Sequence, residues 1–261
     1  MVVGGICLSK RVQAEPARAD MRITVPVTLG MGALWLGSEL AKGSLAPNEC
    51  RWCEPGSLDA SVSRALWAGG GTHAEVAAPT TDVLAFGVVP ALMLGSTLVR
   101  DARVSERGYT DAVVVLEAGM AAALLNQGTK FLVGRERPFV HALGAADKQN
   151  THSPSDNNLS FYSGHTSFTF ALAASATTVA AMRDSKLAPW IAGVGGSLAL
   201  ATGVGRIVAG KHYASDVAVG AVTATLVGVA VPLLLHGRDG STSLQPSVSS
   251  GGGALSYGGT W

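Results

Sequence analysis

The sequence predicts an all-α protein, a polytopic bundle of about six helices that cross a membrane. Of the 261 residues, 48% are hydrophobic and only 14% are charged, a low charge content for a soluble protein. Six apolar stretches are long enough, or nearly so, to cross a bilayer, which takes roughly 17–25 residues per helix. Basic residues gather beside alternate ends of these stretches. The alternative interpretation is a soluble, alanine-rich helical bundle.

The expected spans are dominated by alanine, glycine, valine and leucine, so their hydropathy is moderate. Small residues such as Gly193, Gly195 and Gly196 should let the helices pack closely. No internal repeat divides the chain, so we expect one transmembrane domain over residues 23–235. The six spans are expected at residues 23–41, 82–99, 112–133, 166–182, 188–205 and 214–235.

Two tails flank this domain. Residues 1–22 contain a short apolar run at residues 2–8, which we interpret either as a plain tail or as the remnant of a signal segment. Residues 236–261 are rich in serine and glycine, a composition that predicts disorder.

Basic residues also indicate the threading. With a cytoplasmic amino terminus, the short cytoplasmic segments hold more lysine and arginine than the longer connections on the other side, as membrane insertion favours. The protein should then lie in a bacterial-type inner membrane. The cytoplasmic set is Lys10, Arg11, Arg18, Arg22, Arg100, Arg103, Arg107, Arg183, Lys186 and Arg238; the opposite set is Lys42, Arg51, Arg64, Arg135, Lys148 and Lys211.

Cys50 and Cys53 form a C-x-x-C in the connection between the first two spans. The threading places this connection outside the cytoplasm, where disulfides persist, so a local disulfide is favoured. Zinc would need two further ligands, and a thioredoxin-like redox role lacks its βαβ context. Free thiols are the remaining alternative.

Three cations lie at the ends of expected spans: Lys130, Arg137 and Arg206. An ionisable residue at such a place is a functional candidate by default, although each one alone could simply extend to the lipid headgroups. An arginine can fork two phosphate oxygens, and a lysine supplies a point charge. Pro138 is expected to end the third span and fix the loop that presents Arg137.

Two histidines supply the groups that phosphoryl transfer requires. His212 and Asp216 are four residues apart, so on one helix the carboxylate could accept from one ring nitrogen while the other attacks phosphorus. A surface histidine with a helix partner is the plainer interpretation of that pair. His165 follows Ser163 and Gly164 where the fourth span begins, and helix amides there favour anionic oxygens. It could protonate the leaving oxygen and later activate water.

These blocks, Lys130-x6-Arg137-Pro138, Ser163-Gly164-His165 and Arg206-x5-His212-x3-Asp216, resemble the signature of the type 2 phosphatidic acid phosphatase superfamily. Bacterial class A acid phosphatases and vanadium haloperoxidases share it, and the six-span pattern resembles the membrane branch. Tyr162 stands where the family usually has proline, and Gly205 where it usually has serine. The resemblance implies that His212 is the nucleophile, Asp216 its partner and His165 the acid and base, with a phosphate cradle of Lys130, Arg137, Ser163, Gly164 and Arg206.

The expected function is a membrane phosphatase that hydrolyses a lipid phosphate or diphosphate through a phosphohistidine at the periplasmic face. Undecaprenyl diphosphate, phosphatidylglycerol phosphate, phosphatidate and lipid A phosphates all fit. The alternatives are phosphotransfer to a lipid or sugar, a soluble-type acid phosphatase, a haloperoxidase, and a non-catalytic phospholipid-binding protein. We expect no cofactor and no metal, since the cations carry the charge. A net charge of +1 and the lack of any binding motif exclude nucleic acid as a partner.

Overall fold

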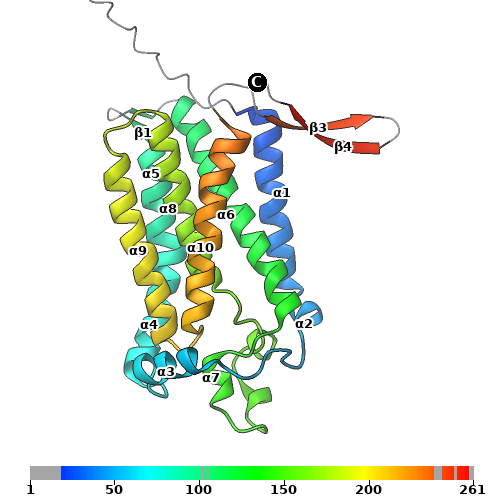
Figure 1. Cartoon of the computed structure of the whole chain (residues 1–261), viewed down its shortest axis with the longest axis vertical. Coiled ribbons are helices and arrows are strands. Elements are labelled where there is room, and N and C mark those ends of the chain that lie inside the picture. The colour runs from blue at the N-terminus through cyan, green and yellow to red at the C-terminus, as the bar shows by residue number, and fades with distance from the viewer. Residues whose placement is uncertain (1–18, 101–102, 105, 238–242, 250–251, 259–261) are drawn as a thin grey trace, which may run out of the picture.

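The computed structural model describes residues 19–100, 103–104, 106–237, 243–249 and 252–258. Long helices stand side by side in one bundle, with short helices and loops gathered at one end (Figure 1). The expected all-α membrane bundle is therefore confirmed. The apolar run at residues 2–8 lies outside the described residues.

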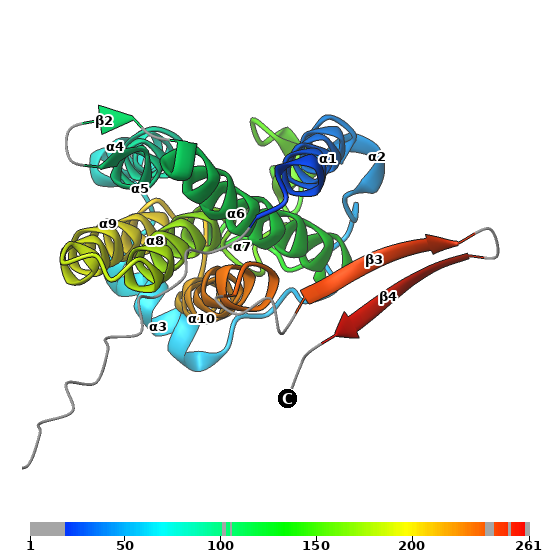
Figure 2. The same cartoon turned by 90° about the horizontal axis from the view of Figure 1, so that it is seen from above.

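Among the described residues, six long helical segments form the bundle, and five of them are long and apolar enough to cross a membrane. The remaining one, α8, has 19 residues and lies among α6, α9 and α10 (Figure 2). Protein surrounds α8, so its threonine and serine side chains meet helices rather than lipid. The segments are α1 (Met21–Leu40), α4 (Thr72–Val83) continued by a π-helical turn (Leu84–Val88) and α5 (Val89–Leu98), α6 (Glu106–Val133), α8 (Gly164–Met182), α9 (Ala188–Val208), and α10 (Ala214–Ala230) continued by a second π-helical turn (Val231–Leu235).

The second span begins ten residues earlier than expected. We expected this span to start at Asp82, whereas α4 already begins at Thr72 and has Pro79 inside it. Asp82 therefore lies within a continuous helical segment rather than at its end. This shift brings Asp82 to the functional site.

The close approach of α8 to its neighbours depends on glycine. A Cβ on Gly228 of α10 would lie 2.6 Å from the carbonyl oxygen of Ala171, and one on Gly195 of α9 would lie 2.9 Å from the Cβ of Ala173. Gly193 and Gly196 differ from the expectation, because no atom lies within 4 Å of a Cβ built there. Gly195 alone of those three is needed for packing.

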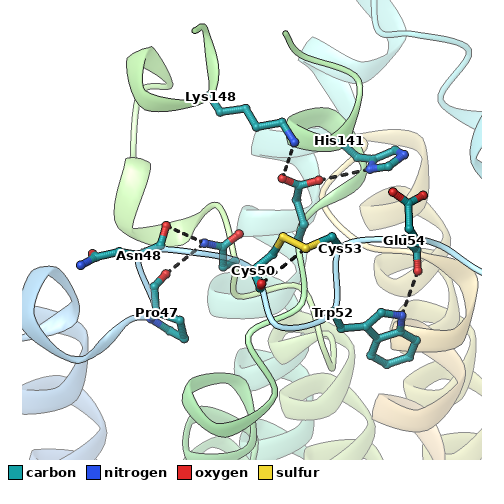
Figure 3. Close-up of a disulfide and its surroundings, with 10 residues drawn as sticks. Pro47, Asn48, Cys50, Trp52, Cys53, Glu54, His141 and Lys148 are labelled. Carbon is teal, nitrogen blue, oxygen red and sulfur yellow. Dashed lines mark hydrogen bonds and ion pairs between the residues drawn. A yellow bond between two sulfur atoms is a disulfide. The ribbon is translucent and has the colours of Figure 1, made fainter. Parts of the chain in front are cut away.

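The connections at the lower end in Figure 1 carry short helical elements, and the disulfide lies in one of these connections. Cys50 and Cys53 are joined, with Cα atoms 5.4 Å apart (Figure 3), so the favoured disulfide is confirmed. The loop between α6 and α8 is pinned by Glu136, which accepts from Lys148 Nζ at 2.6 Å and lies 3.1 Å from Nδ1 of His141. The short elements are α2 (Lys42–Leu45), α3 (Ser57–Leu66), α7 (Pro138–His141) and two 3-10 turns (Lys148–Asn150 and Pro154–Asp156).

Two antiparallel hairpins lie at the opposite end of the bundle (Figure 1). The strands β1 (Val99–Arg100) and β2 (Arg103–Val104) connect α5 to α6. In the tail, β3 (Ser243–Ser249) pairs with β4 (Gly252–Gly258). Both strands lie within residues 236–261, the tail for which the composition predicts disorder.

Candidate active site

The three sequence blocks meet at one end of the bundle, around a cavity of about 570 Å³. The ends of α6 and α9 and the start of α8 are close there because neighbouring helices run antiparallel. Six of the eight predicted site residues line this cavity; Ser163 and Asp216 lie behind it. The six are Lys130, Arg137, Gly164, His165, Arg206 and His212.

The three cations of the cradle are all buried and come from three different elements. Lys130 lies in the last turn of α6, Arg137 precedes α7, and Arg206 lies in the last turn of α9. Gly134, with a φ of +60°, follows the end of α6 at Val133. We had expected Pro138 to end that helix. It is instead the first residue of α7.

Arg137 is held by the loop between α6 and α8. Its Nε donates to the carbonyl oxygen of Asp156 at 2.8 Å, and its backbone N–H donates to Asn157. Burial alone would raise the pKa of Asp156, but Arg137 and Lys42 more than offset this and lower that pKa to about 2. The ionised carboxylate thus helps to keep the neighbouring cations in place.

Arg206 makes two contacts with α4, which carries none of the sequence blocks. Its Nη1 donates to Thr81 Oγ1 at 3.2 Å and to Asp82 Oδ1 at 3.1 Å. A Cβ on Gly205 would lie only 2.5 Å from Cγ2 of Thr81. The glycine that replaces the family's usual serine therefore makes room for Thr81, whose hydroxyl lies next to the cradle arginine.

His212 lies in the loop before α10, and not on a helix shared with Asp216 as we had expected. Its Nδ1 is 2.7 Å from the carbonyl oxygen of Ser160 and 3.8 Å from Oδ2 of Asp216. A carbonyl oxygen can only accept, so Nδ1 carries the hydrogen and the Nε2 lone pair of the neutral ring is free. The backbone of Ser160, rather than the carboxylate, fixes this tautomer.

The environment of His212 favours the neutral ring. Burial lowers its pKa well below the ordinary value, and the positive charges of Arg137, Lys130 and Arg206 lower that pKa further. A neutral imidazole with a free Nε2 is the form that can attack an electrophile.

Asp216 is the centre of a buried hydrogen-bond network. Its Oδ1 accepts from Arg135 Nη1 at 2.5 Å, while its Oδ2 accepts from Ser160 Oγ at 2.6 Å and from the backbone N–H of Tyr213 at 2.9 Å. The last contact caps α10. Because Ser160 also bonds His212, Asp216 positions the histidine through Ser160 as well as by its charge.

Arg135 was not among the predicted site residues. Its guanidinium lies 3.9 Å from the ring centre of Trp52 and 4.3 Å from that of Tyr213, and Nη2 donates to Asp59 at 2.7 Å. It is almost fully buried between the carboxylates of Asp59 and Asp216. The only signal in the sequence was a third cation inside the first block.

His165 lies in the first turn of α8, as expected. Its Nε2 is 2.7 Å from Asp82 Oδ1, and its ring meets the ring of Phe86 edge to face at 4.9 Å. The preceding Gly164 allows a close approach, since a Cβ there would lie 2.9 Å from Asn126 Oδ1 and 3.2 Å from Lys130 Nζ. The glycine therefore keeps the cradle lysine near the helix terminus.

Ser163 differs from its expected role. It is fully buried, its backbone N–H donates to the carbonyl of Asp216 at 3.1 Å, and its hydroxyl accepts from Thr166 at 2.9 Å. Ser163 thus supports the start of α8 instead of facing the cavity. Tyr162, which replaces the family's proline, is held there by Asn126, whose Nδ2 donates to the Tyr162 carbonyl at 2.6 Å.

The cavity has a charged end and an apolar side. Beyond the cradle, Lys42 and Lys211 add positive charge, and Lys211 Nζ lies 4.4 Å from the ring centre of Phe139. Among the described residues, no group of three or more histidine, cysteine, aspartate or glutamate side chains could hold a metal ion. The apolar side is formed by side chains of α1, the π-helical turn after α4, α6 and α8, namely Trp35, Phe86, Met120, Ala123 and Phe168.

The fold and the cavity together define a multi-pass membrane protein with a cavity lined by buried cations at one end of its bundle. Residues 111–239 match the model of the PAP2 superfamily, the same superfamily that the three sequence blocks resemble. The fold is similar to that of a transmembrane PAP2-type phosphatidylglycerolphosphate phosphatase from Bacillus subtilis, with a TM-score of 0.50 and 19% identity over 80% of this chain and 93% of that chain. Comparison with curated protein sequences gives no match.

The contact between Gly205 and Thr81 can be tested by restoring the family's serine. Gly205→Ser should destabilise the protein by about 1–3 kcal/mol, the usual range for overpacking. Thr81→Ala in the same chain should recover most of this loss, as measured by thermal unfolding in detergent. Gly193→Ser, where no atom lies within 4 Å, is the matched control. A double variant no more stable than Gly205→Ser would show that the contact is not responsible.

The low pKa of His212 predicts a pH dependence of stability. In the unfolded chain this histidine takes up a proton as the pH falls below about 6.5, whereas folded His212 stays neutral. The contribution of His212 to the free energy of unfolding is therefore complete above that pH and is lost as the pH falls below it. Relative to His212→Gln, the wild type should lose about 1.4 kcal/mol per pH unit in this acid range. Unfolding curves of both proteins between pH 7.5 and 5 measure this; parallel curves would contradict the neutral assignment.

Proposed function

We propose that the protein is a metal-independent phosphatase that hydrolyses a lipid phosphate or diphosphate. The observation that carries this proposal is the cavity itself. Buried cations and two histidines lie at one end, and an apolar wall between helices leads away from them. A phosphate headgroup would bind at the charged end, and the hydrocarbon chain of the lipid would lie along the apolar wall.

In the proposed first step, Lys130, Arg137 and Arg206 bind the non-bridging oxygens of the phosphoryl group. The free Nε2 of His212 attacks phosphorus, the bond to the leaving oxygen breaks, and His165 gives that oxygen a proton. The products are a phosphohistidine and the dephosphorylated lipid. Asp216 stabilises the positive charge that the His212 ring acquires.

In the second step, water replaces the lipid. His165, now neutral, takes a proton from the water as its oxygen attacks the phosphorus of the phosphohistidine. The bond from phosphorus to Nε2 breaks, which releases phosphate and returns His212 to its neutral form. The cradle holds the transferring group through both steps, so its positive charge does the work that a metal ion does in other phosphatases.

We also propose that the site faces the periplasm. The disulfide between Cys50 and Cys53 lies at the same end of the bundle as the cavity, and disulfides persist outside the cytoplasm. Basic residues beside the other ends of the spans favour the same orientation. A phosphatase of this kind would act on lipids presented in the outer leaflet of the inner membrane.

Phosphate release by the purified protein from a panel of lipid phosphates and diphosphates tests the function. Wild type should release phosphate in the presence of EDTA, because the cradle supplies the charge. His212→Ala should abolish turnover of every substrate, and an acid-labile phosphate should be trapped on wild type quenched into alkali. Phosphoenzyme in His212→Ala equal to wild type would overturn the scheme, and restoration by magnesium or zinc after EDTA would overturn metal independence.

The orientation is tested by thiol labelling. After reduction, a membrane-impermeant maleimide should label Cys50 and Cys53 in intact spheroplasts, because their loop lies outside the cytoplasm in the proposed threading. A Cys7→Ser background removes the third cysteine. Labelling that requires lysis would reverse the threading and place the site in the cytoplasm.

A further inference from the structure

Asp82 lies at the site without belonging to any of the three sequence blocks. Its Oδ1 is 2.7 Å from Nε2 of His165 and 3.1 Å from Nη1 of Arg206. A single carboxylate oxygen thus contacts two groups that the mechanism uses. The side chain lines the cavity and is 55% exposed, so burial of the carboxylate does not explain its position.

The helix that carries Asp82 is fixed against the site. Thr81 packs on Gly205 of α9 and also accepts from Arg206, while Phe86, one turn after Asp82, lies edge to face on His165. These contacts on both sides hold Asp82 in register with the histidine and the arginine. Its carboxylate is therefore placed by the fold.

The charges around His165 show what this carboxylate can do. Lys130 of α6 and Arg206 of α9 face the same cavity, and the amino terminus of α8 adds its own positive dipole. All of them oppose a protonated imidazole, yet a general acid must begin the reaction protonated. Asp82 is the carboxylate in direct contact with the ring.

We propose that Asp82 is a positioning residue for the acid and base His165. An ionised carboxylate can only accept, so Nε2 carries a hydrogen, and Nδ1 is the nitrogen that gives the proton to the leaving oxygen and takes one from water. Asp82 keeps its hydrogen bond during both transfers and balances the charge of the imidazolium. The same oxygen orients Arg206. This inference rests on the proposed phosphatase function.

The alternative role is competition. A carboxylate on Arg206 and His165 could occupy the place of a phosphate oxygen in the free protein and weaken substrate binding. The two roles predict opposite effects of removing its charge. A positioning residue speeds expulsion of poor leaving groups, whereas a competitor slows every substrate.

The test compares Asp82→Asn and Asp82→Glu with wild type on two esters, dioctanoyl phosphatidate and 4-nitrophenyl phosphate. Since kcat/KM covers the steps up to phosphoenzyme formation, Asp82→Asn should lower it roughly 10- to 100-fold for the alkyl ester, whose leaving group needs a proton. For the aryl ester, it should fall less than about threefold, with a burst of 4-nitrophenol as phosphoenzyme accumulates. Asp82→Glu should recover most of the alkyl rate. Glu75→Gln, an exposed carboxylate on the same helix, is the matched control.

Each other outcome has one meaning. Equal losses on both esters without a burst would overturn the positioning role and leave a structural one, and a rise in kcat/KM on both would assign competition instead. Thermal unfolding of the variants shows whether they fold. If Asp82→Asn does not fold, the rates of Asp82→Glu on the two esters test the positioning role. A wild type inactive on both esters would refute the phosphatase function itself.

Discussion

The site depends on one buried interaction, the guanidinium of Arg135 between the carboxylates of Asp59 and Asp216. Both ion pairs are almost fully removed from water, and Ser215 adds hydrogen bonds to Arg135 and to Asp59. Loss of one partner in such a cluster typically costs about 3–5 kcal/mol, because the remaining charge stays buried without compensation. Arg135 follows α6, Asp59 lies in α3 and Asp216 in α10, so the cluster ties three separate segments together at the functional end of the bundle.

His212, the proposed nucleophile, takes its geometry from this cluster. Asp216 accepts from the hydroxyl of Ser160, whose carbonyl accepts from His212, so the orientation of the ring follows from the position of the carboxylate. Trp52 extends the chain outward, because its ring covers Arg135 and it lies within the loop that the disulfide closes. The loop that holds the disulfide therefore supports the position of His212 through a continuous series of contacts. This arrangement is preorganised before any phosphate binds.

Most of the charged residues and both histidines that line the cavity could be predicted from the sequence, but several of their contacts could not. Order and spacing brought Lys130, Arg137, His165, Arg206 and His212 to one cavity, because span ends that carry charge must meet at the same side of a membrane. The tautomer of His212 depends on a backbone carbonyl 52 residues away, which no spacing rule encodes. The predicted start of the second span was wrong because hydropathy indicates where a helix contacts lipid, whereas the helix itself begins ten residues before that apolar stretch. These are tertiary effects, so local pattern carries no signal of them.

The position of α4 explains why this chain has glycine at position 205, where the family usually has serine. A serine at position 205 would need the space that Thr81 occupies, and Thr81 supplies a hydroxyl to Arg206. The substitution of glycine for serine is thus coupled to the position of α4, which in turn determines where Asp82 lies. A change that looks like the loss of a phosphate-binding hydroxyl therefore coincides with a new pair of contacts from a helix outside the motif. In this protein the cradle and α4 form one electrostatic unit, and the chemistry of the site cannot be assigned to the motif residues alone.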